Sequence, residues 1–202
     1  MKTLKQHINE SLKIGKNLSE WSAYSCQPKT KEELKEIIEK RISKEGPNCD
    51  LNDIDVSLIE DMSYLFWKSR FNGDISGWDV SNVKNMKYTF AFSKFNGDIS
   101  KWNTSNVTDM KQMFSGSKFN GDISGWDVSN VKLMRGMFEI SEFNQDISKW
   151  NVNNVANMSY MFFNSGFNRD ISNWKINKDC DTRNMFLHCP IKDEYRPKLP
   201  TK

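Results

Sequence analysis

The chain has 202 residues, enough for one globular domain or for a short repeat array with an end piece. A hydrophobic fraction of 37% and a charged fraction of 27% describe a polar chain that can still build a core. The formal net charge of +3 is too small to indicate nucleic-acid binding, which calls for a concentrated basic face. The sequence contains no run of about 18 apolar residues, the length that a membrane-spanning helix requires.

The two ends of the chain differ from its middle. Residues 1–46 are predicted to form a helical N-terminal cap, because leucine and isoleucine recur at helical spacing over residues 4–14. Residues 30–33, Thr-Lys-Glu-Glu, form a capping box that predicts the start of a second helix, which should end at Gly46. Residues 191–202 contain two prolines and are predicted to be an irregular C-terminal tail.

Residues 47–190 are predicted to be six tandem repeats of 24 residues. The alignment needs no gaps, and the first and last units depart most from the pattern, as terminal repeats do. The tryptophan column is Trp78, Trp102, Trp126, Trp150 and Trp174, and one phenylalanine column is Phe66, Phe90, Phe114, Phe138, Phe162 and Phe186. Because a unit this small cannot bury its apolar face alone, successive units must stack to form a core.

Each unit is interpreted as a short strand followed by a short helix. Trp78 and Val80 are two residues apart, so both side chains fall on one face of a strand. Val83, Met86 and Phe90 follow at spacings of three and four, which places them on one side of a helical segment. This order predicts an α/β repeat solenoid, with a strand, a corner, a short helix and a second corner in every unit.

The pattern over residues 75–90, Ile-x-x-Trp-x-Val-Ser-Asn-Val-x-x-Met-x-x-x-Phe, resembles the BspA-like leucine-rich repeats of bacterial surface proteins. The resemblance covers residues 47–190. It implies a leucine-rich-repeat-like right-handed solenoid of six 24-residue turns, with strands on one wall, short helical turns on the other and an N-terminal helical cap. Members of that family are often cell-surface or secreted proteins with roles in adhesion and in binding host or partner proteins. The opening residues 1–12 are similar to those of proteins from large phages and their hosts.

The N-terminus carries no apolar run resembling a signal peptide, which departs from the surface type. The expected location is therefore the cytoplasm, and the alternative is display on a bacterial cell surface or a virion.

Metal binding and catalysis are both weakly indicated. The asparagine and aspartate columns that begin at Asn72 and Asp74 offer about two oxygen-bearing groups per corner, whereas calcium takes six to eight oxygens. We expect these side chains to satisfy backbone groups at a tight turn, with Gly73 supplying a positive φ. Cys180, His188 and Cys189 lack a fourth zinc ligand at a known spacing. We predict no metal, no cofactor and, with only two histidines in the chain, no catalytic residues.

The outward positions of the predicted strands form the candidate binding surface. If Trp78 and Val80 point inward, the side chains beside them point outward and line up in columns along a strand wall. The candidate residues on this wall are Asp55, Asp79, Lys101, Asn103, Asp127, Lys149, Asn151, Asn173 and Lys175.

The sequence therefore predicts a non-enzymatic module that binds a protein partner through the strand wall, without nucleic acid or membrane insertion. Two alternatives stay open. One is a structural component of a surface or phage assembly, which extended apolar patches on the helical side would favour. The other is a carbohydrate-binding adhesin. The oligomeric state is open as well.

Overall fold

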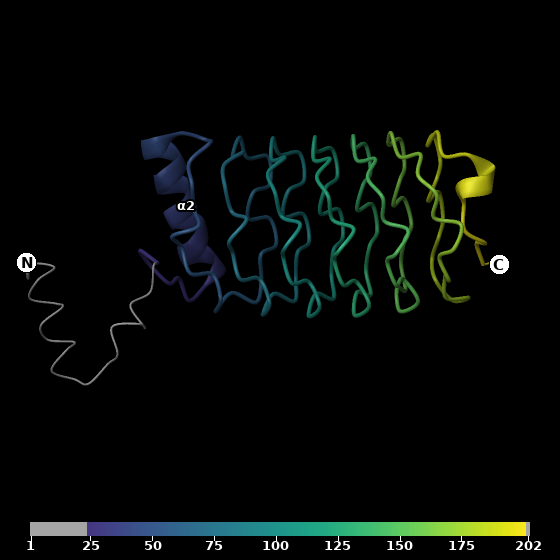
Figure 1. Ribbon diagram of the computed structural model, residues 1–202, viewed down its shortest axis with the longest axis horizontal. Coiled ribbons are helices and arrows are strands. Elements are labelled where there is room, and N and C mark those ends of the chain that lie inside the picture. Colours follow the sequence, from purple (N-terminus) through teal and green to yellow (C-terminus); the bar gives the residue numbers. More distant parts are fainter. Residues whose placement is uncertain (1–23, 201–202) are drawn as a thin grey trace, which may run out of the picture.

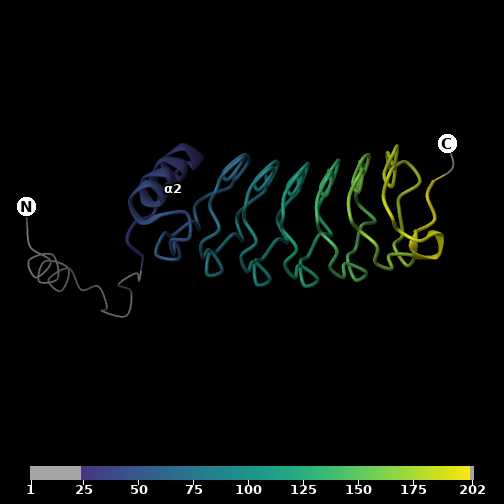
Figure 2. The ribbon, with the colours of Figure 1, turned by 90° about the horizontal axis from the view of Figure 1, so that it is seen from above.

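A computed structural model describes residues 24–200, and the chain in this range winds into a row of stacked coils (Figure 1). Six of the seven isolated parallel bridges join residues 24 positions apart, so one coil takes 24 residues. The helix α2 (Lys31–Glu45) lies at the N-terminal end of the row and the short 3-10 helix η2 (Asp193–Tyr195) at the other end. Figure 2 shows the coils from above, each beside the next.

The predicted α/β, leucine-rich-repeat-like solenoid with a wall of strands is wrong. Between residues 24 and 200 there is no β-strand, only isolated bridges, and the only α-helix is α2, outside the coils. Where the strand was expected, the N–H of Trp78 donates to the carbonyl oxygen of Ile75 at 3.2 Å. The carboxylate of Asp74 accepts the N–H of Ser76 at 2.8 Å. These two turns bend the chain within a few residues, so no extended run forms.

The segment predicted as a short helix is a series of overlapping turns. The N–H of Met86 donates to Asp109 O in the next coil at 2.8 Å, and the N–H of Tyr88 to Lys111 O at 2.9 Å. A helix would direct these N–H groups four residues back along their own coil. Here they join neighbouring coils instead, and the apolar spacing of three and four comes from successive turns.

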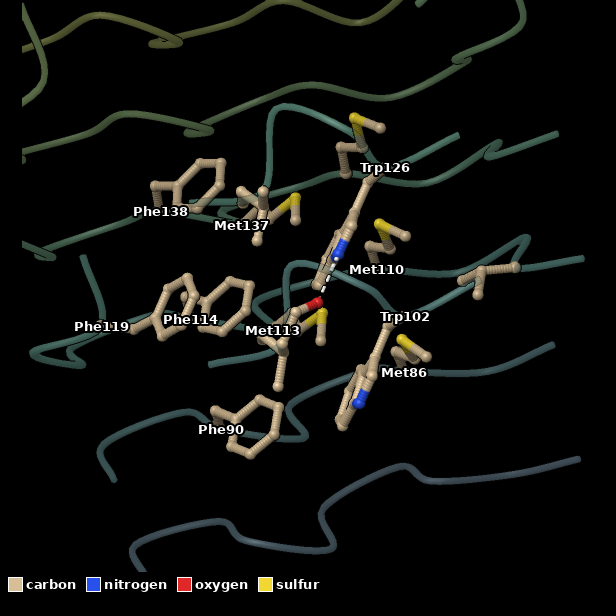
Figure 3. Close-up of a cluster of buried hydrophobic side chains, with 14 of the residues drawn as sticks. Met86, Phe90, Trp102, Met110, Met113, Phe114, Phe119, Trp126, Met137 and Phe138 are labelled. Carbon is tan, nitrogen blue, oxygen red and sulfur yellow. Dashed lines mark hydrogen bonds between the residues drawn. The ribbon is translucent and has the colours of Figure 1, made fainter. Parts of the chain in front are cut away.

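Aromatic and methionine columns form the core (Figure 3). The indole rings of Trp102 and Trp126 stack with centroids 6.4 Å apart, and the rings of Phe90 and Phe114 with centroids 5.6 Å apart. The Nε1 of Trp126 donates to the carbonyl oxygen of Ile99 in the preceding coil at 3.0 Å, the dashed line in Figure 3. The equivalent bond is made by Trp78, Trp102, Trp150 and Trp174. The tryptophan column therefore both fills the core and ties each coil to the one before it.

The glycine of the Asn-Gly corner serves close packing and not a positive φ, so that expectation is wrong. Gly73 has no positive φ. A Cβ at Gly73 would lie 1.9 Å from the carbonyl oxygen of Cys49 and 2.7 Å from the ring of Phe71. Only glycine lets the two backbones approach this closely.

The helix α2 covers the N-terminal end of the stack. Its N-cap residue Thr30 accepts the N–H of Glu33 at 3.2 Å, the bond that the capping-box pattern predicts. Arg41 donates through Nη1 to both carboxylate oxygens of Asp53, at 2.9 and 3.1 Å, which joins the helix to the first coil. The residues of α2 that are buried in the core are Leu34 and Ile38. The first predicted helix, within residues 4–14, lies outside the described residues.

The C-terminal segment closes the opposite end. The N–H of Ile171 donates to the carbonyl oxygen of Tyr195 at 3.0 Å, and the guanidinium of Arg196 lies 5.6 Å from the ring centroid of Phe186. The stretch predicted as an irregular tail thus contains an ordered turn that packs on the last coil.

Candidate binding face

The residues predicted to bind lie at corners of successive coils, since there is no strand wall. All are exposed except Asp55, which is half-buried. Asp79 accepts the N–H of Ser81 at 3.0 Å, and Asn103 accepts the N–H of Ser105 at 3.2 Å. The same type of bond is made by Asp55, Asp127 and Asn151. These five side chains therefore stabilise the corner turns and belong to the framework of the coil.

The remaining predicted residues are three lysines and one asparagine. Asn173 donates through Nδ2 to Ser148 O at 3.0 Å, so it too supports a neighbouring coil. Lys101, Lys149 and Lys175 make no hydrogen bond or ion pair within the described part of the chain. Lys101 and Lys149 occupy the same corner two coils apart, and Lys175 belongs to another column. The lysines are the only predicted residues that remain fully available to a partner.

The asparagine and aspartate columns satisfy backbone groups, and this prediction is confirmed. The Oδ1 of Asn72 accepts the N–H of Asn96 in the next coil at 2.7 Å. The Oδ1 of Asp122 accepts the N–H of Ser124 at 2.8 Å. The asparagine bond recurs from coil to coil at Asn96, Asn120 and Asn144, and the aspartate bond at Asp74, Asp98, Asp146 and Asp170. Across residues 24–200, no group of three or more His, Cys, Asp or Glu side chains is arranged to hold a metal ion.

These corner bonds predict a specific loss of stability in acid. The backbone N–H of the serine two residues on lowers the pKa of Asp98, Asp122 and Asp146 below the ordinary value of 3.8. A carboxylate whose pKa is lower in the folded state contributes stability above its unfolded pKa, and this contribution is lost as the pH falls through the folded pKa. The melting temperature should therefore fall steeply below about pH 4.

Replacing Asp98, Asp122 and Asp146 together with asparagine tests the origin of this loss. Asparagine keeps the accepting Oδ1 but does not titrate. Between pH 5 and pH 2.5, the melting temperature of the triple variant should fall by less than that of the unchanged chain. The difference should be roughly the part of the acid-induced fall that three of the titrating carboxylates contribute. Identical pH profiles for the two proteins would show that the corner carboxylates do not stabilise the fold.

A second face of the stack consists of the overlapping turns and is called the turn face. It comprises residues 63–68, 87–92, 111–116, 135–140, 159–164 and 183–188. The second and sixth residue of each segment has a positive φ, for example 61° at Tyr64 and 54° at Lys68. This conformation directs the N–H toward the next coil: Tyr64 donates to Lys87 O at 3.0 Å, and Lys68 to Ala91 O at 2.9 Å. The turn face therefore contributes three backbone hydrogen bonds to each junction between neighbouring coils.

Large side chains occupy these left-handed positions. Ten are not glycine, and the other two are Gly116 and Gly136. The left-handed region costs a non-glycine residue roughly 1–2 kcal/mol, and a β-branched residue such as Ile140 is an outlier there. Five of the eight exposed large apolar side chains among residues 24–200 lie on the turn face: Tyr64, Trp67, Phe92, Ile140 and Leu187.

Side chains of the turn face contact one another from coil to coil. The rings of Tyr64 and Tyr88 stack with centroids 4.7 Å apart, and the hydroxyl of Tyr88 donates to Gln112 Oε1. The ring of Phe92 lies over Gly116, where an added Cβ would come within 2.4 Å of it. Sequence reasoning missed this surface. A signal was present, because the column that begins at Tyr64 varies whereas the column two residues further along is phenylalanine in every unit; the varying residues are Tyr64, Tyr88, Gln112, Gly136, Tyr160 and Asn184.

The stacked 24-residue coils and their two contrasting faces define a tandem-repeat protein with a continuous core. Residues 33–141 and residues 92–194 each match the family model described as "Mycoplasma protein of unknown function, DUF285". The two matches overlap and together span well over half of the chain, so the chain belongs to this family. No curated protein and no solved structure matches it. In the part of the chain that the structure describes, no helix is long and apolar enough to cross a membrane.

Proposed function

We propose that this chain is a non-enzymatic module that binds a protein partner, and that it does so through the turn face. One observation carries the proposal. Exposed, bulky side chains stand at backbone positions where glycine would be less strained, and the stack accepts glycine at the equivalent positions Gly116 and Gly136. Residues held in an unfavourable backbone conformation cluster at functional sites, so bulky side chains at these positions support a functional role of this face.

The exposure of these side chains supports the same proposal. Trp67, Phe92 and Ile140 are 44%, 49% and 50% exposed, although each could bury most of its surface in a core. Apolar groups gathered on one face of a folded protein mark an interaction surface. The residues predicted to bind, which lie at corners of successive coils, form a different surface that we call the corner face. Most of its polar side chains are already engaged with the backbone.

The repeat type agrees with a binding role. We propose that the 24-residue units are of the BspA-like type, because the buried columns of tryptophan, valine, methionine and phenylalanine match that pattern unit by unit. Proteins with such repeats are associated with adhesion and partner binding.

Removing the apolar side chains should abolish binding and spare the fold. In a variant with both Phe92→Gly and Ile140→Gly, relief of backbone strain offsets the lost contacts, so the free energy of unfolding should change by no more than about 1 kcal/mol. In a pull-down from the native source, a protein retained by the unchanged chain should be lost by this variant. It should be retained by the control variant Lys101→Ala with Lys149→Ala on the corner face. Retention of the same proteins by both variants contradicts a role of the turn face.

A structural component of a larger assembly is the second candidate, because apolar side chains exposed on the turn side also suit permanent packing. Light scattering separates the two. A defined large assembly of the purified chain that Phe92→Gly with Ile140→Gly disperses would favour the structural role.

A further inference from the structure

We propose that the occupant of the turn face is an acidic protein segment, whose carboxylates reach the side chains of Lys68, Lys87 and Arg135 while its apolar side chains contact Phe92 and Ile140. This inference rests on the proposed function and specifies the chemistry of the partner.

The coils divide their charge unevenly between the turn face and the remaining surface. The turn face contains five basic residues and one acidic residue. Residues 47–190 contain fifteen basic and seventeen acidic residues in all, so ten basic and sixteen acidic residues lie outside the turn face. The turn face therefore has a net charge of +4 and the remainder of the array −6, although the array as a whole is close to neutral. Such a basic face attracts acidic partners and repels basic ones.

Three of the five basic side chains on the turn face form no ion pair with a described residue. Lys111 pairs with Asp109 at 3.1 Å, and Arg183 with Asp181 at 2.8 Å. Lys68, Lys87 and Arg135 make no ion pair with any described residue. Their charges are thus available to a partner.

The three cations are held next to the apolar groups by the aromatic rings. The Nζ of Lys68 lies 4.4 Å from the ring centroid of Trp67, and the Nζ of Lys87 lies 5.6 Å from that of Tyr88. The guanidinium of Arg135 lies 5.3 Å from the ring centroid of Tyr160. Cations placed in this way are partly ordered before a partner binds, which reduces the entropy lost on binding.

The same contacts favour a protein over a single-stranded nucleic acid. Bases bind to proteins by stacking on open aromatic faces. On the turn face, Tyr64 and Tyr88 stack on each other, and cations lie over the rings of Trp67 and Tyr160. Ile140, which is 50% exposed, has no face for stacking but suits an aliphatic partner side chain.

The spacing of the coils also fits an extended acidic segment. Equivalent buried rings in successive coils, such as Phe90, Phe114 and Phe138, lie 5.6 and 5.8 Å apart. Side chains on one face of an extended chain are about 6.6 Å apart. An extended segment running along the stack therefore presents about one side chain to each coil.

A charge-reversal experiment with a defined probe tests this inference. The probe is a fluorescent peptide of about ten residues in which glutamate alternates with leucine, and its control is the same peptide with glutamine in place of glutamate. The test variant combines Lys87→Glu with Arg135→Glu. The matched control variant combines Lys101→Glu with Lys149→Glu on the corner face. Both variants change the net charge by −4, and both place the two substitutions 48 residues, or two coils, apart.

The glutamate peptide should bind the unchanged chain at least about tenfold more tightly than the glutamine peptide. The turn-face reversal should weaken that binding at least about tenfold and the corner-face reversal less than about twofold. The idea is overturned by equal binding of the two peptides, by equal effects of the two reversals, by absence of peptide binding, or by tighter binding of an oligothymidylate of similar length.

Failure of the acidic-partner inference can be distinguished from failure of the proposed binding role of the turn face. If Phe92→Gly with Ile140→Gly removes the native partner but Lys87→Glu with Arg135→Glu does not, the turn face is a binding surface and its partner is not acidic. If neither variant removes a partner, the binding role of the turn face fails as a whole.

Discussion

Replacing Trp126 with alanine should lower the free energy of unfolding by about 3–5 kcal/mol. The indole ring is 3% exposed and stacks on Trp102 with a centroid distance of 6.4 Å. It also lies 6.2 Å from the ring of Phe114, and its Nε1 donates to Ile99 O at 3.0 Å. Alanine would leave a cavity in the middle of the stack and a buried carbonyl without its donor. Denaturant-induced unfolding followed by circular dichroism measures the loss.

The variant Trp126→Phe separates packing from hydrogen bonding. Phenylalanine keeps much of the ring volume but cannot donate to Ile99, so it should cost about 1–3 kcal/mol, less than alanine. Because each coil contacts only its neighbours, the effect should also depend on position. The equivalent change at Trp174, in the last tryptophan position before the C-terminal cap, is expected to cost less than the change at Trp126. A loss below about 1 kcal/mol for Trp126→Ala would mean that the stacked indoles do not support the core.

Replacing Gly73 with alanine should destabilise the protein by about 1–3 kcal/mol, although it adds only one methyl group. The new Cβ would lie 1.9 Å from Cys49 O, a backbone atom that also accepts the N–H of Asp74 at 3.2 Å. The second coil would have to move away from the first. A lowered unfolding midpoint in denaturant is the expected measurement.

Gly125→Ala is the matched control. A Cβ at Gly125 meets no atom closer than Ser100 O at 4.0 Å, and its φ is not positive. Alanine there restricts the unfolded chain and should be neutral or stabilising by up to about 1 kcal/mol. Equal unfolding midpoints for Gly73→Ala and Gly125→Ala would show that the close approach of the first two coils does not require glycine at position 73.

The sequence alone determined the length of the coil and the composition of its core. Trp78, Trp102 and the other tryptophans of their column recur at a constant interval. Because each of them is buried at the same place in its coil, every coil must contain the same number of residues. The start of α2 at Thr30 could be predicted for a similar reason, since capping is a bond between residues three apart. The backbone role of Asp122 and its equivalents followed from local turn chemistry.

The tertiary structure decided the path of the chain within each coil. Trp78 and Val80 are both buried, as a strand would place them, yet turns on either side keep the chain from extending. Met86 and Phe90 are buried at helical spacing without a helix, because their N–H groups donate to the next coil. The periodicity of apolar residues predicts which side chains are buried. It does not predict which carbonyl groups accept the backbone N–H groups.

The strand wall was wrongly predicted for the same reason, and the candidate binding residues lie at corners of the coils instead. Lys101 and Lys149 are exposed, as predicted, because burial follows from the alternation around the tryptophan. The defining property of the turn face, a positive φ at residues such as Tyr64 and Ile140 that rarely adopt one, could not be predicted from the sequence. Bonds to the neighbouring coil impose that conformation, and a neighbour 24 residues away does not appear in any local pattern.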